Sequence, residues 1–326
     1  RESVCDPHLP EKIKEGRLDE ILTCTGCMQR CLYPNSFEEG FGISCMINPF
    51  SGKEHIWEIT PAEKKKKIAV VGAGPVGLQA AWILAKRGHE VKVYEKEITA
   101  GGQYRLAAVP AMKQELAKTI STYLTFCKKY GAEVIYGVKA TKEMLEQEGF
   151  DEIILACGAQ PLVPRIPGID GENVYLANQV LSFDVRLSGQ KILVLGAGLV
   201  GAEAAEVLST YGNKVTVVDM LDKAAPLAPL RPRENLLSRL DKAGVGFCLN
   251  SRVCEIRPDG IRYDQNGETK EMTGFDSIVL AFGSRSDKAL ETEYEGDHRI
   301  HSVGDCLTAG DAKKGIYEAT KLAMVL

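Results

Sequence analysis

The chain has 326 residues, of which 40 are Lys or Arg and 44 are Asp or Glu, so its formal net charge is −4. At about 150 residues per domain, this length predicts about two domains, each with its own core. Hydrophobic residues make up 44% of the chain and charged residues 26%, which excludes a disordered or fibrous protein. The near-balanced charge, with no basic block beyond Lys64–Lys67, predicts that no nucleic acid is bound.

The N-terminal residues contain no basic segment followed by an apolar run, so we expect no signal peptide. The most apolar stretch, Ile68–Ala85, contains Pro75 and three glycines, and is better interpreted as strand, turn and helix than as a membrane span. The ten cysteines are not those of a short secreted disulfide scaffold, because four of them cluster within 22 residues. We therefore expect no membrane association and a reducing, cytoplasmic compartment.

The first 60 residues contain four cysteines in the spacing C-x2-C-x3-C-x13-C, namely Cys24, Cys27, Cys31 and Cys45. Thiolates in such a spacing hold a [4Fe–4S] cluster or a structural zinc ion, and unliganded thiols are a third interpretation. Zinc sites commonly contain two C-x2-C pairs, whereas this run has one. Three close cysteines and a distant fourth favour a cubane cluster, because each iron needs a ligand at its own corner. The apolar neighbours would exclude water: Met28, Leu32, Phe41 and Ile43.

Two later stretches are copies of one another. The run Lys67–Gly77 has the pattern strand and G-x-G-x-x-G, and the run Lys191–Gly201 repeats it. The first glycines of the two copies are 124 positions apart (196 − 72). The acidic residues that end the following strands, Glu95 and Asp219, are separated by the same 124 positions (219 − 95). The glycines of the two copies are Gly72, Gly74 and Gly77, and Gly196, Gly198 and Gly201.

This order of residues has a physical basis. The first glycine allows a tight turn, the second lets the backbone approach a diphosphate, and the third lets helix pack on strand. The diphosphate lies at the helix N-terminus, and the acidic residue about 20 positions on accepts hydrogen bonds from ribose hydroxyls. Two complete copies therefore predict either two bound dinucleotides, or one dinucleotide and one ADP-like fragment. Asp219, with no arginine directly after it, favours NAD over NADP in the second copy.

The remaining patterns define how the copies are arranged. We expect a helix over residues 111–130, strands over 133–136, 151–157 and 275–282, a hairpin turn at Asn266-Gly267, and a helix over 315–326. Prolines 161, 164 and 167 suggest a crossing between domains. The fold class is thus α/β, with two nested Rossmann-like dinucleotide-binding domains in a two-dinucleotide flavoprotein fold. The predicted domains are 1–60 for the cysteine-rich segment, 61–160 and 285–326 for the first nucleotide unit, and 161–284 for an inserted second unit.

These motifs resemble one family across essentially the whole chain. The segment Asp6–Asp19, the cysteine run with Cys45-x-x-Asn48-Pro49, and Gly101-Gly102-Gln103 are similar to those of trimethylamine dehydrogenase and 2,4-dienoyl-CoA reductase. These proteins form the iron–sulfur branch of the old yellow enzyme flavoproteins. Near the C-terminus, Gly304-Asp305 stands where the two-dinucleotide reductases contact the FAD ribityl chain; capping of a helix or turn is the alternative role for Asp305.

The resemblance implies three groups of site residues. The [4Fe–4S] ligands would be Cys24, Cys27, Cys31 and Cys45. The FAD site would contain Gly72, Gly74, Gly77, Glu95, Gly102, Gln103 and Asp305. The NAD(H) site would contain Gly196, Gly198, Gly201 and Asp219. It names no catalytic side chain beyond the cluster ligands.

Members of that branch also carry an N-terminal (β/α)8 barrel of about 250 residues with FMN and the substrate site, which this sequence does not contain. We therefore expect an NADH-dependent flavin and iron–sulfur oxidoreductase, a subunit or fragment, that exchanges electrons with an FMN-containing barrel partner. An electron-transfer flavoprotein is a further candidate partner. The resemblance implies enoate or enoyl reduction, or amine oxidation or demethylation, in the partner.

Two other functions fit parts of the sequence. A disulfide reductase of thioredoxin-reductase type needs a C-x-x-C pair beside the flavin, and Cys24 and Cys27 lie outside both nucleotide units. A docking module would hold ADP as a structural ligand on one of the two copies. The visible spectrum of the purified chain separates these possibilities from the main prediction.

Overall fold

The computed structural model describes residues 2–32 and 43–326. The chain divides into two compact units. The first contains residues 1–108, 114–160 and 285–326, and the second contains residues 109–113 and 161–284. Among the described residues, no helix combines the length and the apolar character needed to cross a membrane.

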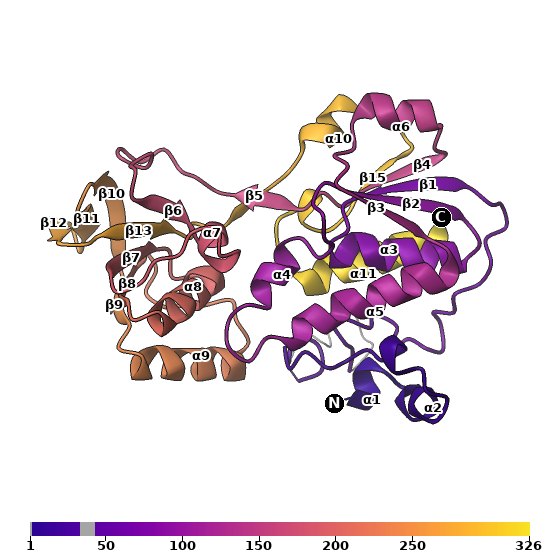
Figure 1. Ribbon diagram of the computed structural model, residues 1–326, viewed down its shortest axis with the longest axis horizontal. Helices are drawn as coiled ribbons and strands as arrows, with labels where there is room; N and C mark the ends of the chain where they lie inside the picture. The colour runs from indigo at the N-terminus through magenta and orange to yellow at the C-terminus, as the bar shows by residue number, and fades with distance from the viewer. Residues whose placement is uncertain (1, 33–42) are drawn as a thin grey trace. The chain divides into compact units, whose positions relative to one another are not determined.

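The first unit is built on a parallel sheet of five strands in the order β15-β4-β1-β2-β3 (Figure 1). Its strands are β1 (Lys67–Val71), β2 (Glu90–Glu95), β3 (Glu133–Tyr136), β4 (Glu152–Leu155) and β15 (Ile300–Ser302). The apolar run Ile68–Val71 places β1 at the centre, buried on both faces, as expected for a parallel sheet covered by helices. Consecutive strands of this sheet end at the same edge, which gathers loops from distant parts of the sequence.

The helices of the first unit are α1 (Glu2–Cys5), α2 (Leu9–Lys14), η1 (Leu18–Glu20), α3 (Pro75–Lys86), α4 (Gln103–Ala107), α5 (Glu115–Tyr130), α6 (Lys142–Glu148), α10 (Ala289–Glu293), η3 (Gly304–Cys306) and α11 (Ala312–Val325). Helix α3 packs on β1 and β2 and lies between α5 and α11 (Figure 1). The helix predicted from residue 111 begins at Glu115 instead, because Met112 has a left-handed backbone (φ 63°) that no α-helix accommodates.

The second unit repeats this architecture with a parallel sheet in the order β6-β13-β7-β8-β9. Its elements are β6 (Val174–Leu176), α7 (Ala177–Leu181), β7 (Lys191–Leu195), α8 (Leu199–Thr210), β8 (Lys214–Val218), α9 (Leu230–Lys242), β9 (Gly246–Cys248) and β13 (Ser277–Leu280). An antiparallel sheet of β10 (Ser251–Arg257), β11 (Gly260–Gln265) and β12 (Glu268–Thr273) completes it. The predicted hairpin turn is confirmed, since Asn266 and Gly267 join β11 to β12 with φ of 54° and 81°.

The chain passes between the units through β5 (Ala159–Pro161) and β14 (Ser284–Ser286), which pair with one another. The predicted α/β class with two dinucleotide-binding folds is confirmed. The duplication is also precise in structure: α3 spans residues 75–86 and α8 spans residues 199–210, which is the offset of 124 positions found in the sequence (199 − 75).

A buried ion pair lies within the N-terminal segment, next to a ring of α5. Lys12 Nζ lies 2.7 Å from Asp6 Oδ2 and 2.8 Å from the carbonyl oxygen of Glu20, and it lies over the ring of Phe126. Asp6 is only 2% exposed and also accepts a hydrogen bond from the backbone N–H of Leu22. The pair is therefore largely removed from water, where loss of one partner leaves an uncompensated charge.

We predict that Lys12→Met lowers the free energy of unfolding by about 3 kcal/mol, because it leaves the Asp6 carboxylate buried without its cation. Lys129→Met is the matched control. Lys129 pairs with Glu20 at 2.7 Å but its side chain is 38% exposed, so its loss should cost less than about 1 kcal/mol. Urea denaturation measures both, and equal losses for the two variants would contradict the prediction.

Candidate functional site

The first glycine loop connects β1 to α3 and has no room for side chains at two of its three glycines. A Cβ on Gly72, whose φ is 106°, would lie 2.4 Å from the carbonyl oxygen of Ala156, and one on Gly77 would lie 2.0 Å from the carbonyl oxygen of Gly72. A Cβ on Gly74 would meet nothing within 4 Å. The first and third glycines are thus required by internal packing, whereas the second is open to a ligand.

The acidic residue at the end of β2 supports this loop. Glu95 is buried, and its Oε2 accepts a hydrogen bond from the backbone N–H of Ala73 at 2.8 Å. Its Oε1 accepts one from the N–H of Glu97 at 3.0 Å. A carboxylate has about four lone-pair positions, so these two bonds leave acceptor capacity for ribose hydroxyls. Glu95 therefore orders the loop.

The second loop, between β7 and α8, has the same contacts. A Cβ on Gly196 would lie 2.3 Å from the carbonyl oxygen of Ala281, one on Gly201 would lie 1.9 Å from that of Gly196, and one on Gly198 would meet nothing within 4 Å. Asp219 accepts hydrogen bonds from the N–H groups of Ala197 and Leu221. In both loops, the first and third glycines are therefore closely packed against carbonyl oxygens, and the second glycine is open.

The structural repeat extends beyond the motif that the sequence indicated. The N–H of Gly101 donates to the carbonyl oxygen of Ala73 at 2.8 Å, and the N–H of Ala225 donates to that of Ala197 at 2.7 Å. Gly101 and Ala225 are again 124 positions apart (225 − 101), and both have positive φ, 115° and 46°. Sequence reasoning missed this contact because an alanine replaces the glycine in the second copy. The constant offset was the signal that could have found it.

In the first unit, Gly102 and Gln103 follow one another in the chain close to Gly74, the open glycine of the first loop. A Cβ on Gly102 would lie 3.9 Å from the Cα of Gly74, so the two backbones are neighbours. Gln103 begins α4, and its Nε2 donates to the carbonyl oxygen of Ala159 at 2.6 Å. This bond fixes the side chain of Gln103 at the first residue of β5.

The Gly304-Asp305 pair lies on the first turn of α3. A Cβ on Gly304 would lie 3.0 Å from Val76, and its N–H donates to Glu318 Oε2 at 3.1 Å. Asp305 Oδ1 accepts from the N–H of Gly310 at 3.0 Å, and burial raises the pKa of Asp305. The structure thus gathers Gly102 and Asp305 around the N-terminus of α3, although about 200 residues separate them.

These surroundings fit the diphosphate of a dinucleotide. Gly74 is the N-cap of α3 and Gly198 is the N-cap of α8, and neither helix has a side-chain cap. The N–H groups of a helix's first turn have no partner within the helix, and the helix dipole adds to their attraction for an anion. In each unit, the helix that follows the glycine loop therefore has an uncapped N-terminus behind an open glycine.

The four predicted cysteine ligands lie in the N-terminal segment of the first unit, and all are partly buried. Burial raises the pKa of Cys27, and the nearby Cys31 and Cys24 add to the effect. Burial also raises the pKa of Cys45 to about 12, with contributions from Cys27 and Cys24. Cys27 therefore lies within electrostatic reach of Cys24 and Cys31, and Cys45 lies within electrostatic reach of Cys24 and Cys27.

Backbone groups also point at these sulfurs. The sulfur of Cys45 accepts hydrogen bonds from the backbone of Ile47 and Asn48, and that of Cys27 from the backbone of Gln29. Among the described residues, no three or more His, Cys, Asp or Glu side chains stand together as a formed metal site. The prediction that apolar neighbours shield the cysteines is wrong for Leu32 and Ile43, which are exposed, and Phe41 lies outside the described residues.

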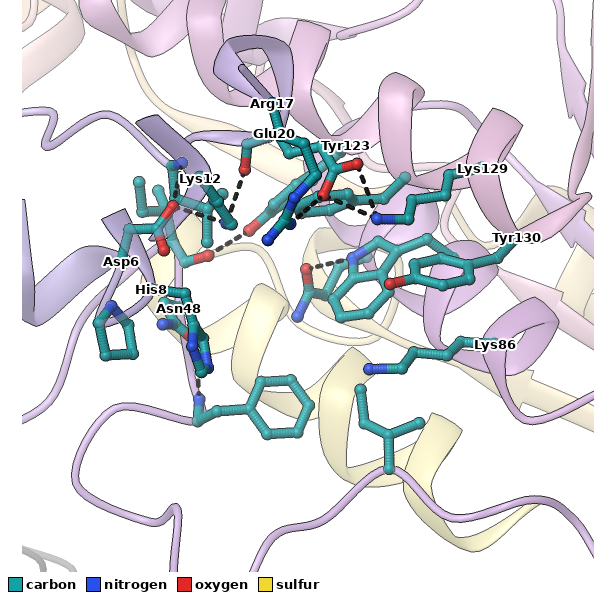
Figure 2. A pocket seen from close by; sticks show the side chains of 18 of the residues that line it. Asp6, His8, Lys12, Arg17, Glu20, Asn48, Lys86, Tyr123, Lys129 and Tyr130 are labelled. Carbon is teal, nitrogen blue, oxygen red and sulfur yellow. Dashed lines mark hydrogen bonds and ion pairs between the residues drawn. The ribbon is translucent and has the colours of Figure 1, made fainter. Parts of the chain in front are cut away.

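A separate cavity of about 610 Å³ opens between the N-terminal segment and helices α3 and α5 (Figure 2). Figure 2 shows Lys12, Arg17 and Lys129 converging on the acidic groups of Asp6 and Glu20 on its wall. The described residues that line it include none of the predicted nucleotide-binding or cysteine ligands. The cavity is thus distinct from both glycine loops.

The comparisons with known proteins agree with the duplicated loops. The profile of the family described as "Pyridine nucleotide-disulphide oxidoreductase" matches residues 66–318. The chain belongs to this family. Membership implies FAD and NAD(H) as its nucleotides, and it makes the chain part of an oxidoreductase.

Several relatives are similar along almost the whole chain. An NADH oxidase of Thermoanaerobacter brockii is 34% identical over 94% of this chain and 49% of its own length. A bilirubin reductase of Mediterraneibacter gnavus is 32% identical over 100% and 50%. The structure of 2-naphthoyl-CoA reductase superposes with a TM-score of 0.93 at 31% identity, covering 100% of this chain and 50% of the other. This flavin oxidoreductase chain therefore spans about half the length of the curated relatives it matches.

We predict that Gly77→Ala mainly lowers stability, whereas Gly74→Ala mainly lowers the binding of FAD. Gly77→Ala places a methyl group against the carbonyl oxygen of Gly72 and should lower the free energy of unfolding of the nucleotide-free chain by about 1–3 kcal/mol. Gly74→Ala changes an open N-cap position, so it should cost less than about 1 kcal/mol while lowering retained FAD at least about tenfold. Urea denaturation and the flavin-to-protein absorbance ratio measure the two effects. A Gly74→Ala chain that retains full FAD would contradict the site.

Proposed function

We propose that this chain is an electron-transfer module that passes electrons between NAD(H), FAD and a [4Fe–4S] cluster. The observation that carries the proposal is the pair of glycine loops with matching contacts, one in each unit, which suits two nucleotides on one chain. The predicted organisation assigns the cluster to residues 1–60, FAD to 61–160 and 285–326, and NAD(H) to 161–284.

In the first unit, the proposed FAD site is formed by Gly72, Gly74, Gly77, Glu95, Gly102, Gln103 and Asp305. The open Gly74 and the first turn of α3 would bind the diphosphate, since their N–H groups are uncapped. Glu95 holds the loop through Ala73 and would accept hydrogen bonds from the ribose. Asp305, which follows the glycine packed on Val76, would contact the ribityl chain.

In the second unit, the proposed NAD(H) site is formed by Gly196, Gly198, Gly201 and Asp219. Asp219 is partly exposed at the end of its strand and would accept hydrogen bonds from the adenosine ribose. A carboxylate at this position repels a 2′-phosphate, which supports NADH over NADPH. The name of the T. brockii relative, an NADH oxidase, agrees with this choice.

When bound, the nucleotides supply two-electron hydride chemistry and the cluster supplies one-electron transfer. The residues proposed to hold the cluster are Cys24, Cys27, Cys31 and Cys45. Backbone hydrogen bonds to the sulfurs of Cys27 and Cys45 support this role, because such bonds stabilise thiolates and tune cluster potentials. The likeness of these segments to the trimethylamine dehydrogenase and 2,4-dienoyl-CoA reductase family supports iron–sulfur over zinc.

The partner is proposed to be an FMN-containing (β/α)8 barrel, in another chain or in the same longer protein. The relatives named as reductases are about twice as long as the matching region, which leaves room for such a domain in them. The barrel would act on the substrate, by enoate or enoyl reduction or by amine oxidation or demethylation. An electron-transfer flavoprotein is the second candidate partner.

The flavin-reduction experiment tests the nucleotide assignment. We predict that anaerobic NADH bleaches the visible flavin absorbance of the purified chain, and that NADPH does so at least about tenfold more slowly, because Asp219 repels its phosphate. Gly198→Ala should retain FAD yet lose at least about tenfold of the NADH rate, while dithionite still reduces it. A chain that holds only ADP, or a Gly198→Ala variant bleached at the normal rate, would contradict the assignment.

The metal content tests the cysteine assignment separately. We predict about four irons and four acid-labile sulfides per chain, with a broad brown absorbance. Cys45→Ser should lose most of both, whereas Cys127→Ser, which changes a lone buried thiol on α5, should keep them. About one zinc per chain would identify a structural zinc site instead, and equal loss in both variants would show a general folding defect.

A further inference from the structure

The proposed function makes no use of the cavity between the N-terminal segment and helices α3 and α5 (Figure 2). Its volume of about 610 Å³ is typical of pockets for small organic ligands, which commonly measure about 300–1,000 Å³. All the residues that line it belong to the first unit, so one compact part of the chain forms it. The chemistry of its wall therefore indicates what it can bind.

Aromatic rings form one wall of this cavity. The ring centroid of Trp82, on α3, lies 5.2 Å from that of Phe126 and 6.0 Å from that of Tyr130, both on α5. The ring of Phe50 lies 6.3 Å from Trp82 on another side. The indole N–H of Trp82 already donates to Gln79 Oε1 at 2.9 Å, so the indole needs no polar partner from a ligand. This wall therefore favours an aromatic ligand body.

The cations of the cavity differ in how they are neutralised. Four Lys or Arg side chains of the described residues line it, and Lys12, Arg17 and Lys129 each pair with a carboxylate. Within the part of the chain that the structure describes, the fourth cation, Lys86, forms no ion pair. Its ammonium group lies 5.6 Å from the ring centroid of Tyr130 instead. Lys86 therefore remains available to an anionic ligand.

Two ammonium groups lie over the ring of Tyr130. Lys129 is 5.7 Å from the ring centroid, and Figure 2 shows Lys86, Tyr130 and Lys129 along one side of the cavity. Partial burial lowers the pKa of Lys86, and the positive charge of Lys129 adds to the effect. A bound anion would relieve both effects, because it hydrogen-bonds to the ammonium group and offsets the repulsion between the two lysines.

The available cation lies next to the aromatic wall. Trp82 and Lys86 are four positions apart on α3, so they share one face of the helix. We propose that this cavity binds a small aromatic carboxylate, with its ring against Trp82 and Tyr130 and its carboxylate on Lys86. The inference does not depend on the proposed electron-transfer function.

An aromatic amine is the competing ligand, because carboxylates also line the cavity. Glu54 and Glu58 are exposed and lie between Phe50 and β1, outside the two helices that carry the rings of Trp82, Phe126 and Tyr130. Lys86, in contrast, lies on the same helix face as the Trp82 ring. The position of the charge relative to the rings therefore favours the carboxylate.

A ligand in this cavity would contact the segment that carries Cys45. Ile47 and Asn48 line the cavity, and the hydroxyl of Tyr123 donates to the carbonyl oxygen of Ile47 at 2.6 Å. The lining includes none of the proposed nucleotide-binding or cluster residues, so such a ligand would compete with neither NADH nor FAD. Its binding can be measured whether or not the proposed electron transfer is correct.

Tryptophan fluorescence of the full chain tests the proposal, because the two tryptophans of the sequence, Trp57 and Trp82, both line the cavity. The probes are 3-phenylpropionate, 3-phenylpropanamide and 3-phenylpropylamine, which share a ring and differ in charge. We expect a saturable change with the carboxylate, at an affinity at least about tenfold higher than that of the neutral amide or of the amine. Titration calorimetry gives the same affinities without interference from flavin.

Two lysine variants test the assigned contact. Lys86→Met should weaken the binding of 3-phenylpropionate at least about tenfold and leave that of the amide within about twofold, because only the charged contact is lost. Lys118→Met is the matched control, since Lys118 is an exposed lysine of α5 outside the cavity lining. It should change neither affinity.

The comparison of the three probes on the wild-type chain decides the matter even where a variant does not fold. No saturable binding of 3-phenylpropionate, or equal affinity for the amide, would overturn the proposal. Tighter binding of the amine would do the same and would assign the site to a cation. Equal losses in Lys86→Met and Lys118→Met would also overturn it.

Discussion

The close approach of helix to strand at the third glycine of each loop is the constraint on which the site depends. Gly77 and Gly201 lie so near the carbonyl oxygens of Gly72 and Gly196 that no side chain fits between them. This contact sets α3 and α8 directly behind the ends of β1 and β7. Each helix therefore presents its uncapped N-terminus at the edge of a parallel sheet, where a diphosphate is attracted by free N–H groups and by the dipole.

Hydrogen bonds also hold the two glycine loops in place. Glu95 and Asp219 reach back to the loop through the N–H groups of Ala73 and Ala197, and the carbonyl oxygens of the same two residues accept from Gly101 and Ala225. In each loop, the N–H group and the carbonyl oxygen of one residue, Ala73 or Ala197, are thus both hydrogen-bonded. A loop restrained in this way is already arranged for its ligand before binding, which lowers the entropy lost on association. The acidic residue accordingly has a structural role in addition to the ribose contact expected of it.

The N-terminal segment is held in place by buried polar contacts. It has little regular structure, and it is attached to α5 by the hydroxyl of Tyr123, which donates to the carbonyl oxygen of Ile47 at 2.6 Å. Lys12, buried with its partner Asp6, also lies over the ring of Phe126 on α5. Buried polar contacts of this kind are weak sources of net stability, but they allow few alternative arrangements. They place Cys24, Cys27 and Cys45 against the same apolar cluster as Tyr104 of α4.

The sequence alone determined the local features. The G-x-G-x-x-G runs, the acidic residues, the Asn266-Gly267 turn and the offset of 124 positions each depend on residues close together in the chain, where backbone geometry limits the choice. Tertiary structure alone decided that Gly102 lies beside Gly74 and that Gly304 packs on Val76 of α3. The physical reason is the parallel sheet, whose strands all end at one edge and so bring together loops that no spacing rule connects.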